Sequence, residues 1–401
     1  MKINIIPSEL AGSVKAPPSK SYAHRYLIAA ALAEGESTVE GVEMSGDIAS
    51  TEACLSALGA SLIRRGDRIT VYGGGKLKEN AVFPCGESAS TLRFLLPLAL
   101  LHENRAVFSA EPRLLERGIG VYEKLFAEKG VKVEKTPSAI TVKGRLCPGD
   151  YRVAGNVSSQ YISGLLFTLP LLDGESRLTV LPPVESKPYI GMTLDVLYKA
   201  GIEIRKESGN CFRIPGGQRY HPIREKTEGD WSGAAVFYAL NDLGHKINVT
   251  GLSENSLQGD RAIVSLLCAL KKPSPVIELA DTPDLAPILF AAAAAGNGAV
   301  FTGTGRLKLK ESDRAAVMAE ELAKCGVKVK MEENRMTVFG GTLCKPKETL
   351  SSHHDHRIAM ALSILLTKVG GEIQGTEAVG KSWPGYWDAL CALGCRMKIE
   401  T

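Results

Sequence analysis

The chain has 401 residues, of which 44% are hydrophobic and 23% are charged, and its formal net charge is +4. This composition is that of a soluble globular protein, and the length exceeds what one hydrophobic core usually organises, so two domains are expected. The Lys and Arg residues form small separated clusters, which argues against a nucleic-acid-binding protein and favours a compact anionic metabolite as the ligand.

The N-terminal segment and the cysteines indicate the compartment. Residues 1–6, Met-Lys-Ile-Asn-Ile-Ile, alternate like a β-strand and do not form the apolar block of a secretory signal. The nine cysteines are scattered without a C-x-x-C pair, which is typical of reduced, mostly buried thiols. Since no uninterrupted apolar run reaches membrane-spanning length, we expect a soluble, cytoplasmic protein that has no membrane segment.

A pattern of helix, glycine stop, strand, turn and strand recurs along the chain. Its first copy has helical periodicity over Thr51–Leu58, a stop at Gly59, and strands over 60–64 and 68–73. The later copies cover Tyr122–Gly144, Met192–Gly216 and Ala315–Gly340, with a degenerate copy at Ile263–Leu279 and a truncated one at Tyr386–Glu400. Most steps are about 70 residues long, which indicates a repeat architecture.

Further apolar helices are expected between these copies. They are predicted at Tyr22–Ala33, Thr91–Leu101, Tyr161–Leu172, Ala234–Leu243, Leu285–Ala295 and Ile358–Thr367. Each repeat then offers a half-buried sheet and one or two helices to cover it, so we expect about six α/β units, three to a domain. The alternative is a set of unrelated α+β segments with coincidental spacing, and the aligned glycine stops argue against it.

Small hydroxyl residues stand at the starts of several predicted helices. They occur in the segments 17–25, 87–93, 156–161 and 229–232. Any one of them could simply cap its helix, which is the commoner role of such residues. Because they recur with Lys, Arg and Gln between them, they favour helix N-termini that converge on a shared anion. Ser21 and Arg25 are i,i+4 neighbours and could meet one ligand.

Two charged segments carry a more specific signal. Residues 310–314 read Lys-Glu-Ser-Asp-Arg, and residues 353–357 read His-His-Asp-His-Arg. If Lys310 and Arg314 share a helix, both cations lie on one face, with Glu311 one step off that face. Such a group could hold a multiply charged anion and move a proton beside it.

Other chemistries have weaker support in the sequence. The histidines of residues 353–356 lack the regular ligand spacing of a metal site, and Arg357 beside them disfavours a dication. The chain has no G-x-x-x-x-G-K-[ST] phosphate loop and no G-x-S-x-G nucleophile elbow. The sequence therefore does not predict a metal centre, a P-loop or an α/β-hydrolase site.

These motifs fall in the order and rough spacing of a known family. They are residues 20–25 (Lys-Ser-Tyr-Ala-His-Arg), 116–117 (Glu-Arg), 158–160 (Ser-Ser-Gln), 186–189 (Ser-Lys-Pro-Tyr), 310–314, 355–357 (Asp-His-Arg) and Lys381. Over almost its whole length, the chain resembles the 5-enolpyruvylshikimate-3-phosphate synthases. The resemblance implies a two-domain inverted (inside-out) α/β barrel, each domain built from three repeats of a βαβαββ-type unit. It also implies domains at 1–17 plus 229–401 and at 18–228, with the active site in the cleft between them.

The resemblance assigns substrate roles to the matching positions. It places most shikimate-3-phosphate ligands in 18–228 and most phosphoenolpyruvate ligands in the other domain. The implied shikimate-3-phosphate ligands are Lys20, Ser21, Arg25, Ser158, Ser159, Gln160, Ser186, Tyr189, Asp284 and Lys310. The implied phosphoenolpyruvate ligands are Lys20, Ala89, Arg117, Gln160, Arg314, Arg357 and Lys381. Guanidinium groups suit this substrate, because it carries both a carboxylate and a phosphate.

The implied reaction is an addition followed by an elimination that expels phosphate. Asp284 would take the proton of the 5-hydroxyl group, Glu311 would protonate C3 and later remove that proton, and Lys20 would neutralise or protonate the leaving phosphate. His356 belongs to the same implied catalytic group. Each proton transfer is worth roughly 10²–10⁴-fold, and the cations would supply the larger electrostatic share. The family needs no metal and no organic cofactor.

Three positions depart from the family pattern. Residues 87–90 read Glu-Ser-Ala-Ser where the family usually has Asn-Ala-Gly-Thr, so the methyl group of Ala89 would narrow the phosphoenolpyruvate pocket. We therefore predict weak inhibition by glyphosate, the family's larger competitor of phosphoenolpyruvate. Gly118 replaces the proline that usually follows Arg117, which favours a more mobile loop, and Arg306 stands where one branch of the family has Asn.

Two alternative functions stay open. A sister transferase that acts on UDP-N-acetylglucosamine has a similar fold, but its motif begins Lys-Asn and it relies on a loop cysteine, whereas Ser21 follows Lys20 here and Cys85 lacks the matching context. The other is a non-catalytic repeat scaffold that binds acidic partners, and the presence of all the proposed catalytic positions argues against it. The family also suggests a monomer, whose domains close on the substrates to exclude water.

Overall fold

The computed structural model describes residues 1–75 and 80–400. The chain divides into two compact units, of which unit 1 comprises Met1–Pro17 and Gly229–Thr401, and unit 2 comprises Pro18–Glu228. Each unit has a separate core of buried hydrophobic side chains. The chain therefore crosses between the units twice, after Pro17 and before Gly229.

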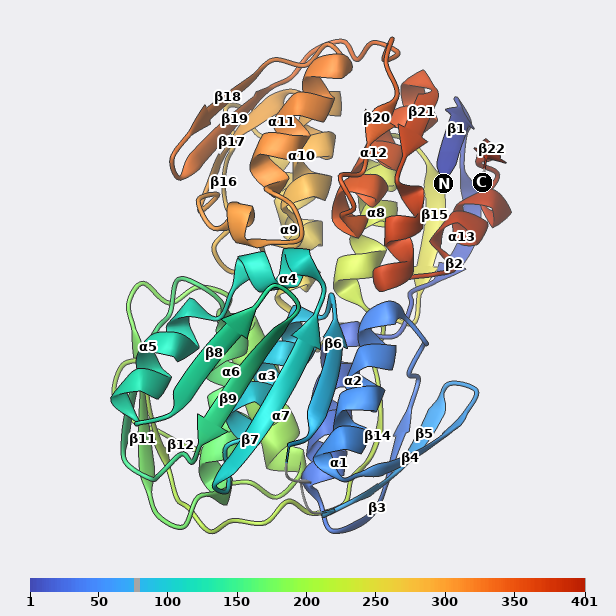
Figure 1. Cartoon of the computed structure of the whole chain (residues 1–401). Coiled ribbons are helices and arrows are strands. Elements are labelled where there is room, and N and C mark those ends of the chain that lie inside the picture. Colours follow the sequence, from blue (N-terminus) through green and yellow to red (C-terminus); the bar gives the residue numbers. More distant parts are fainter. Residues whose placement is uncertain (76–79, 401) are drawn as a thin grey trace. The chain divides into compact units, whose positions relative to one another are not determined.

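Unit 2 contains three four-stranded sheets that share one topology (Figure 1). In each sheet the first two strands pair in parallel and the remaining neighbours pair antiparallel. The first sheet has the order β14 (Arg224–Lys226), β3 (Gly35–Glu40), β5 (Arg68–Gly73) and β4 (Ser61–Arg65). The second has β6 (Val82–Gly86), β7 (Asn104–Ala110), β9 (Ala139–Gly144) and β8 (Lys132–Thr136). The third has β10 (Asp150–Ala154), β11 (Ser176–Leu181), β13 (Cys211–Ile214) and β12 (Arg205–Lys206).

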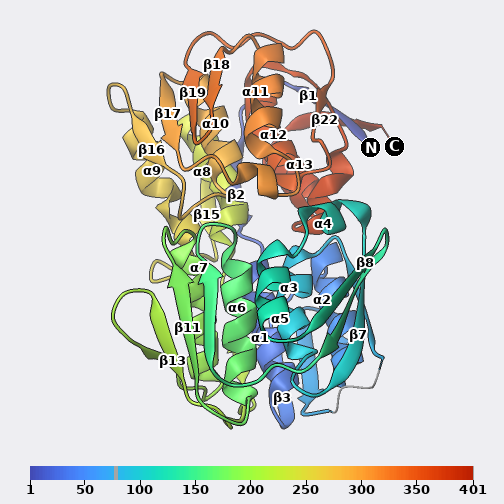
Figure 2. The same ribbon diagram turned by 60° about the vertical axis from the view of Figure 1, so that its left-hand side comes forward.

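The helices of unit 2 lie between its sheets, except for the short helix α4 at one end of the unit (Figure 2). They are α1 (Lys20–Leu32), α2 (Gly46–Leu58), α3 (Ala89–Leu98), α4 (Pro112–Arg117), α5 (Gly120–Glu128), α6 (Ser159–Thr168), the 3-10 turn η1 (Leu169–Leu171) and α7 (Lys187–Lys199). Helices α1, α3 and α6 are buried on almost every side, as expected for helices that are apolar all round. The sheets bury one face on these helices, so unit 2 has its helices inside and its sheets outside.

Unit 1 repeats this arrangement with one incomplete sheet. One sheet has the order β20 (Leu350–Ser351), β21 (Gly371–Gln374), β1 (Lys2–Ile6) and β22 (Arg396–Glu400). Another has β16 (Val276–Glu278), β17 (Gly298–Thr302), β19 (Arg335–Phe339) and β18 (Val329–Glu332). The third consists of β15 (Lys246–Thr250) and β2 (Ala11–Lys15), which pair in parallel.

The helices of unit 1 again form the interior. They are α8 (Trp231–Asp242), α9 (Ile263–Leu270), α10 (Ala286–Ala295), α11 (Arg314–Lys324), α12 (His356–Val369) and α13 (Tyr386–Ala392), with 3-10 turns η2 (Gly259–Ala262), η3 (Leu307–Leu309) and η4 (Thr376–Lys381). Helices α8, α10 and α12 pack on one another, and most of their residues are buried. Both units thus have the inside-out α/β architecture that was expected from the sequence.

The predicted repeat is confirmed by the local backbone. A glycine with positive φ follows the helix in each complete copy: Gly59 (113°), Gly130 (73°), Gly201 (77°) and Gly326 (82°). Glycine is favoured at these positions because a Cβ atom would be strained in this conformation. The truncated last copy contributes β22 alone, and the N-terminal strand β1 pairs with it antiparallel. The beginning of the chain therefore completes the sheet that its end leaves unfinished.

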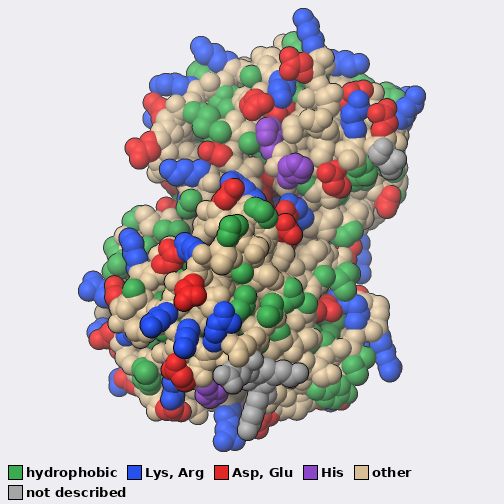
Figure 3. Space-filling model, in the orientation of Figure 1, with side chains coloured by type: hydrophobic (Ala, Val, Ile, Leu, Met, Phe, Trp, Pro, Cys, Tyr) green, Lys and Arg blue, Asp and Glu red, His purple; other side chains and the backbone are tan. Residues whose placement is uncertain are grey.

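No helix within residues 1–75 and 80–400 is long and apolar enough to cross a membrane. On the face drawn in Figure 3, Lys and Arg side chains are scattered among Asp and Glu side chains and do not gather into a continuous basic band. Five of the nine free cysteines are buried (Cys54, Cys85, Cys211, Cys325 and Cys395), and the other four are exposed.

Candidate active site

The charged segment 310–314 does not form one helix, so that part of the sequence interpretation was wrong. Lys310 directly follows the turn η3, and Arg314 is the first residue of α11, with the Asp313 side chain capping the helix at the N–H of Ala316. The backbone is extended at Lys310, and Asp313 then starts a new helix as a favourable N-cap residue. The two cations nevertheless meet, since both contact the same carboxylate oxygen of Asp284.

Asp284 lies in the turn before α10 and is the centre of this charge cluster. Its Oδ1 atom accepts from Lys310 Nζ at 3.0 Å and from Arg314 Nη1 at 2.7 Å. Burial alone would raise the pKa of Asp284, but the charges of Lys310, Arg314 and Arg357 outweigh it and hold that pKa well below its ordinary value. Burial lowers the pKa of Lys310 and the charge of Asp284 opposes that shift. Asp284 is therefore a firmly ionised counter-ion.

Arg314 is the most enclosed cation of the cluster, with a side chain that is 1% exposed. It also donates from Nη2 to Glu311 Oε2 at 2.8 Å and from Nε to Asp355 Oδ2 at 2.8 Å. Although burial disfavours its charge, the carboxylates raise the pKa of Arg314 well above its ordinary value. Arg314 therefore joins three carboxylates that come from three separate segments of unit 1.

The second charged segment forms the start of α12. The Asp355 side chain caps this helix through the N–H of Arg357 at 2.9 Å and accepts from Ser312 Oγ at 3.0 Å. Arg357 is 6% exposed, and its Nε atom is buried with no hydrogen-bond partner in the described part of the chain. A buried guanidinium donor at a helix N-terminus is well suited to an anion. His356 is 4% exposed, and its Nδ1 atom lies 3.9 Å from Asp355 Oδ1.

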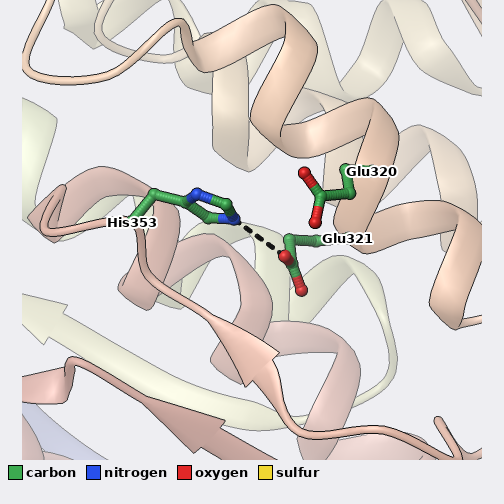
Figure 4. A group of neighbouring side chains, drawn as sticks. All are labelled: Glu320, Glu321 and His353. Carbon is green, nitrogen blue, oxygen red and sulfur yellow. Dashed lines mark hydrogen bonds and ion pairs between the residues drawn. The ribbon is translucent and has the colours of Figure 1, made fainter.

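A brace between α11 and the segment before α12 supports this helix start (Figure 4). The ring of His353 points toward the buried Glu321, and Nε2 lies 2.9 Å from Oε1. His353, Glu321 and the exposed Glu320 place ligand atoms within 4.8 Å of one another, which is close enough for a metal ion. The ammonium group of Lys324 already lies 2.8 Å from Glu321 and 3.2 Å from Glu320, and the N–H of Ser351 donates to Glu321 at 3.0 Å. Since the carboxylate of Glu321 already has these partners, we interpret the group as a structural contact between α11 and the segment before α12.

The backbone of this segment is in an unfavourable conformation at two consecutive residues. His353 and His354 both have positive φ, 48° and 58°, which is unfavourable for residues with a Cβ atom. Lys381, one of the expected phosphoenolpyruvate ligands, donates from Nζ to the carbonyl oxygen of His354 at 2.9 Å. The segment that carries Arg357 is therefore held from two sides.

Asp260 is a member of this region that the sequence interpretation missed. It lies in η2, is 2% exposed, and its pKa is raised to about 6 by burial and by the charge of Asp284. Arg357 lowers that pKa and Asp230 raises it further, so the carboxyl lies within electrostatic range of the cluster. Nothing in the sequence around a single Asp after a glycine indicated that it would be buried beside other carboxylates.

Unit 2 contains a second group of expected site residues. Lys20, the first residue of α1, donates from Nζ to Asp47 Oδ2 at 2.7 Å. Arg25 is 3% exposed, and it donates to the carbonyl of Ser21 at 2.7 Å, to Thr193 Oγ1 at 2.8 Å and to the carbonyl of Tyr189 at 3.1 Å. Arg25 therefore connects α1 to α7, and the expectation that Ser21 and Arg25 meet one ligand stays a prediction.

Gln160 connects two of the predicted helix starts. Its Nε2 atom donates to Ser90 Oγ at 2.9 Å, and its Oε1 atom accepts from Arg93 Nη1 at 2.8 Å. Arg93 also donates to the carbonyl of Gly118 at 3.3 Å, and Tyr161 donates to the same oxygen at 3.2 Å. Arg93 belongs to the predicted segment 87–93 but was not assigned to a substrate, and it connects α3, Gln160 and the loop after Arg117.

The remaining expected ligands of unit 2 lie at or near helix starts. Ser158 caps α6 through the N–H of Gln160, and Ser159 is the first residue of that helix. Ser186 precedes α7 with φ of 54° and is 3% exposed, so it holds an unfavourable backbone conformation in a buried place. Such residues are often found at binding sites. Ala89 is the first residue of α3 and is 6% exposed.

Comparison with known proteins identifies the family. A family model for EPSP synthase (3-phosphoshikimate 1-carboxyvinyltransferase) matches residues 5–271 and 265–390. The 3-phosphoshikimate 1-carboxyvinyltransferase of Clostridium perfringens is 37% identical and aligns over 100% of both chains. The chain belongs to the EPSP synthase family. The enzyme of the same name from Clostridium acetobutylicum is 39% identical over 98% of this chain and 97% of its own length.

Solved structures show the same fold. The EPSP synthase of Acinetobacter baumannii has a TM-score of 0.81 at 22% identity, with 100% of both chains covered. The enolpyruvyl transferase NikO of Streptomyces tendae has a TM-score of 0.78 at 17% identity, covering 99% of this chain and 98% of its own. The two-domain inside-out α/β architecture of this family is therefore also that of the present chain.

Proposed function

We propose that this member of the EPSP synthase family transfers the enolpyruvyl group of phosphoenolpyruvate to the 5-hydroxyl of shikimate-3-phosphate, which gives 5-enolpyruvylshikimate-3-phosphate and phosphate. The observation that carries the proposal is the cluster of Asp284, Lys310, Glu311 and Arg314, in which two cations and two carboxylates lie within hydrogen-bond distance of one another. Cations bind the anionic substrate, and carboxylates beside them move protons. A passive anion-binding scaffold has no need for the carboxylates.

The roles divide between the two units of the chain. We assign phosphoenolpyruvate mainly to Arg314, Arg357 and Lys381 of unit 1, together with Lys20, Ala89, Arg117 and Gln160 of unit 2. We assign shikimate-3-phosphate mainly to unit 2, through Lys20, Ser21, Arg25, Ser158, Ser159, Gln160, Ser186 and Tyr189, with Asp284 and Lys310 added from unit 1. The buried Nε atom of Arg357, which has no hydrogen-bond partner among the described residues, supports its place on the anion.

Asp284 serves as the base for the 5-hydroxyl proton. In the substrate-free protein, Lys310, Arg314 and Arg357 hold the pKa of Asp284 well below its ordinary value, which makes it a weak base. When phosphoenolpyruvate brings its own negative charges to Arg314 and Arg357, part of this stabilisation is offset and the pKa of Asp284 rises. The base is therefore activated by the arrival of the second substrate.

Glu311 serves as the proton carrier at C3. Glu311 enters the addition step in its protonated form. As the 5-hydroxyl oxygen bonds to C2, Glu311 gives its proton to C3, and a tetrahedral intermediate forms. Loss of phosphate then restores the double bond while Glu311 takes a proton back from C3. Over the cycle the hydroxyl proton ends on the released phosphate, which Lys20 neutralises. Glu311 is 27% exposed and bonded to Arg314, so it is held in place and is accessible to a substrate.

The assignment is tested by measuring phosphate release with both substrates and with each omitted in turn. We expect release only when shikimate-3-phosphate and phosphoenolpyruvate are both present. Release with phosphoenolpyruvate alone, or with UDP-N-acetylglucosamine in place of shikimate-3-phosphate, would contradict it. We further propose that the enzyme is a monomer and is weakly inhibited by glyphosate. Sedimentation at working concentration tests the monomer, and a dimer that persists on dilution would refute it.

A further inference from the structure

A buried histidine of unit 2 has no role in the reaction described above. His24 lies on α1, one turn after Lys20, and is 1% exposed. Its Nδ1 atom lies 2.7 Å from Thr51 Oγ1, and its Nε2 atom has no hydrogen-bond partner in the described part of the chain. Burying a ring nitrogen without a partner is costly, and this cost needs an explanation.

Three hydroxyl groups continue from His24 to the start of α3. Thr51 Oγ1 of α2 lies 2.7 Å from Thr91 Oγ1 of α3, and Thr91 Oγ1 lies 2.7 Å from Ser88 Oγ. All three side chains are at most 1% exposed. Ser88 caps α3 by accepting from the N–H of Thr91 at 3.3 Å. The series of hydrogen bonds therefore runs from α1 through α2 to the N-terminus of α3, and every side chain in it is buried.

The number of protons available to these side chains fixes the donor and the acceptor of each hydrogen bond between His24 and Ser88. Thr51 Oγ1 donates to the carbonyl of Asp47 at 3.1 Å, so it accepts from both His24 and Thr91. Thr91 then accepts from the hydroxyl of Ser88, and His24 carries its proton on Nδ1. Burial lowers the pKa of His24 to about 3, so the ring stays neutral and holds this tautomer at neutral pH. Every hydroxyl group in the chain is then satisfied.

The chain of bonds ends at expected ligands of phosphoenolpyruvate. Ser88 directly precedes Ala89, and Ser90 accepts from Gln160 at 2.9 Å. At the other end, α1 and α2 are joined a second time by the ion pair of Lys20 and Asp47 at 2.7 Å. Buried hydrogen bonds and this ion pair thus connect the three helix starts that carry Lys20, Asp47 and Ala89.

We propose that His24 is a positioning residue that acts through Thr51 and Thr91 on Ser88, and thereby sets the helix start that receives the phosphate group of phosphoenolpyruvate. The proposal rests on the proposed function. It predicts a specific kinetic effect. Breaking one of the hydrogen bonds between His24 and Ser88 shifts the start of α3, which raises the KM for phosphoenolpyruvate and leaves the KM for shikimate-3-phosphate nearly unchanged.

Four variants test the proposal. His24→Asn keeps a donor near the position of Nδ1, whereas His24→Leu removes it, and Thr51→Val interrupts the chain one step further on. Thr168→Val is the matched control, because Thr168 is also a fully buried threonine of unit 2, but its hydroxyl donates only to the carbonyl of Gly164 within α6. We expect His24→Leu and Thr51→Val to raise the KM for phosphoenolpyruvate about tenfold, the effect of losing one buried hydrogen bond. We expect His24→Asn to stay within about twofold and Thr168→Val to leave both KM values unchanged.

The result also separates this proposal from the proposed function. If the wild-type protein releases no phosphate from the two substrates together, the proposed function fails. If it is active but the variants lower Tm without changing the KM for phosphoenolpyruvate, or change both KM values equally, His24 is only structural and the proposal is refuted. Should His24→Leu not fold, Thr51→Val and His24→Asn decide between these outcomes. Nitrogen NMR of the wild type adds an independent check, since protonation on Nε2 in place of Nδ1 would overturn the hydrogen-bond direction.

Discussion

Arg314 and Asp355 form a buried ion pair between the starts of α11 and α12, with Nε 2.8 Å from Oδ2 and side chains that are 1% and 0% exposed. A second contact joins Nη2 to Oδ1 at 3.3 Å, so the guanidinium and the carboxylate meet with two atoms each. This pair holds together the two helix starts that carry the expected cations of unit 1. Loss of this pair is therefore expected both to destabilise unit 1 and to displace the two helix starts.

Replacing Asp355 by Asn should be strongly destabilising. The amide keeps a cap for α12 but leaves the buried guanidinium of Arg314 without part of its counter-charge, which costs about 3–5 kcal/mol. Urea unfolding of both proteins measures the difference. Glu116→Gln is the control, because its pair with Arg113 is exposed and is worth at most about 1 kcal/mol. A loss below about 1 kcal/mol in Asp355→Asn would show that the pair is not needed.

Replacing Glu311 by Gln should abolish most turnover without unfolding the protein. If Glu311 carries the proton at C3, we expect kcat to fall roughly 10²–10⁴-fold. Steady-state phosphate release measures this, with thermal unfolding as the check on folding. Glu320→Gln changes an exposed glutamate of α11 and should keep kcat within about twofold. If Glu311→Gln retains wild-type kcat, the protein is a binding scaffold or uses another acid.

Replacing Ala89 by Gly should increase inhibition by glyphosate. Ala89 is buried at the start of α3, and removing its methyl group leaves more room beside the expected phosphate position. We expect the inhibition constant to fall at least about tenfold, which is the effect of relieving roughly 1.4 kcal/mol of steric conflict. Ala127→Gly, at an exposed position of α5, controls for the general effect of glycine in a helix. Unchanged inhibition in Ala89→Gly would rule out the methyl group as the cause.

The stability of the protein should depend on pH through Asp260. Its pKa is raised to about 6 in the folded protein, from 3.8 as the ordinary value, so between these pH values the folded state keeps a proton that the unfolded chain has released. The contribution of Asp260 to the free energy of unfolding therefore falls as pH rises from about 4 to 6 and is fully lost above it. This loss amounts to about 3 kcal/mol.

The variant Asp260→Asn removes this titration. We expect its free energy of unfolding, relative to the wild type, to increase by up to about 3 kcal/mol between pH 4 and pH 7.5. Urea unfolding of both proteins across this range measures the difference. A difference that stays constant with pH would mean that Asp260 is ionised in the folded protein as it is in the unfolded chain.

Which side chains of the site contact one another could not be predicted from the sequence. The spacing of Lys310 and Arg314 suggested one helix face, whereas they meet at Asp284, which lies 26 residues before Lys310. Arg25, which stays an expected ligand, also donates to Thr193, 168 residues away, and nothing in the sequence indicated this contact. Asp260 and Asp47 gave no signal, because burial and through-space charge are not visible in the order of residues.

The sequence by itself determined the architecture, the family and the helix starts at which many of the expected ligands lie. Helical periodicity, glycine stops and helix caps depend on neighbouring residues, so the repeat and the helix starts could be predicted from local patterns. Only the tertiary structure decided which charges pair, that Asp284 is held firmly ionised, and that His24 reaches Ser88 through two threonines. These properties arise from contacts between segments that are distant along the chain, and burial then sets their strength.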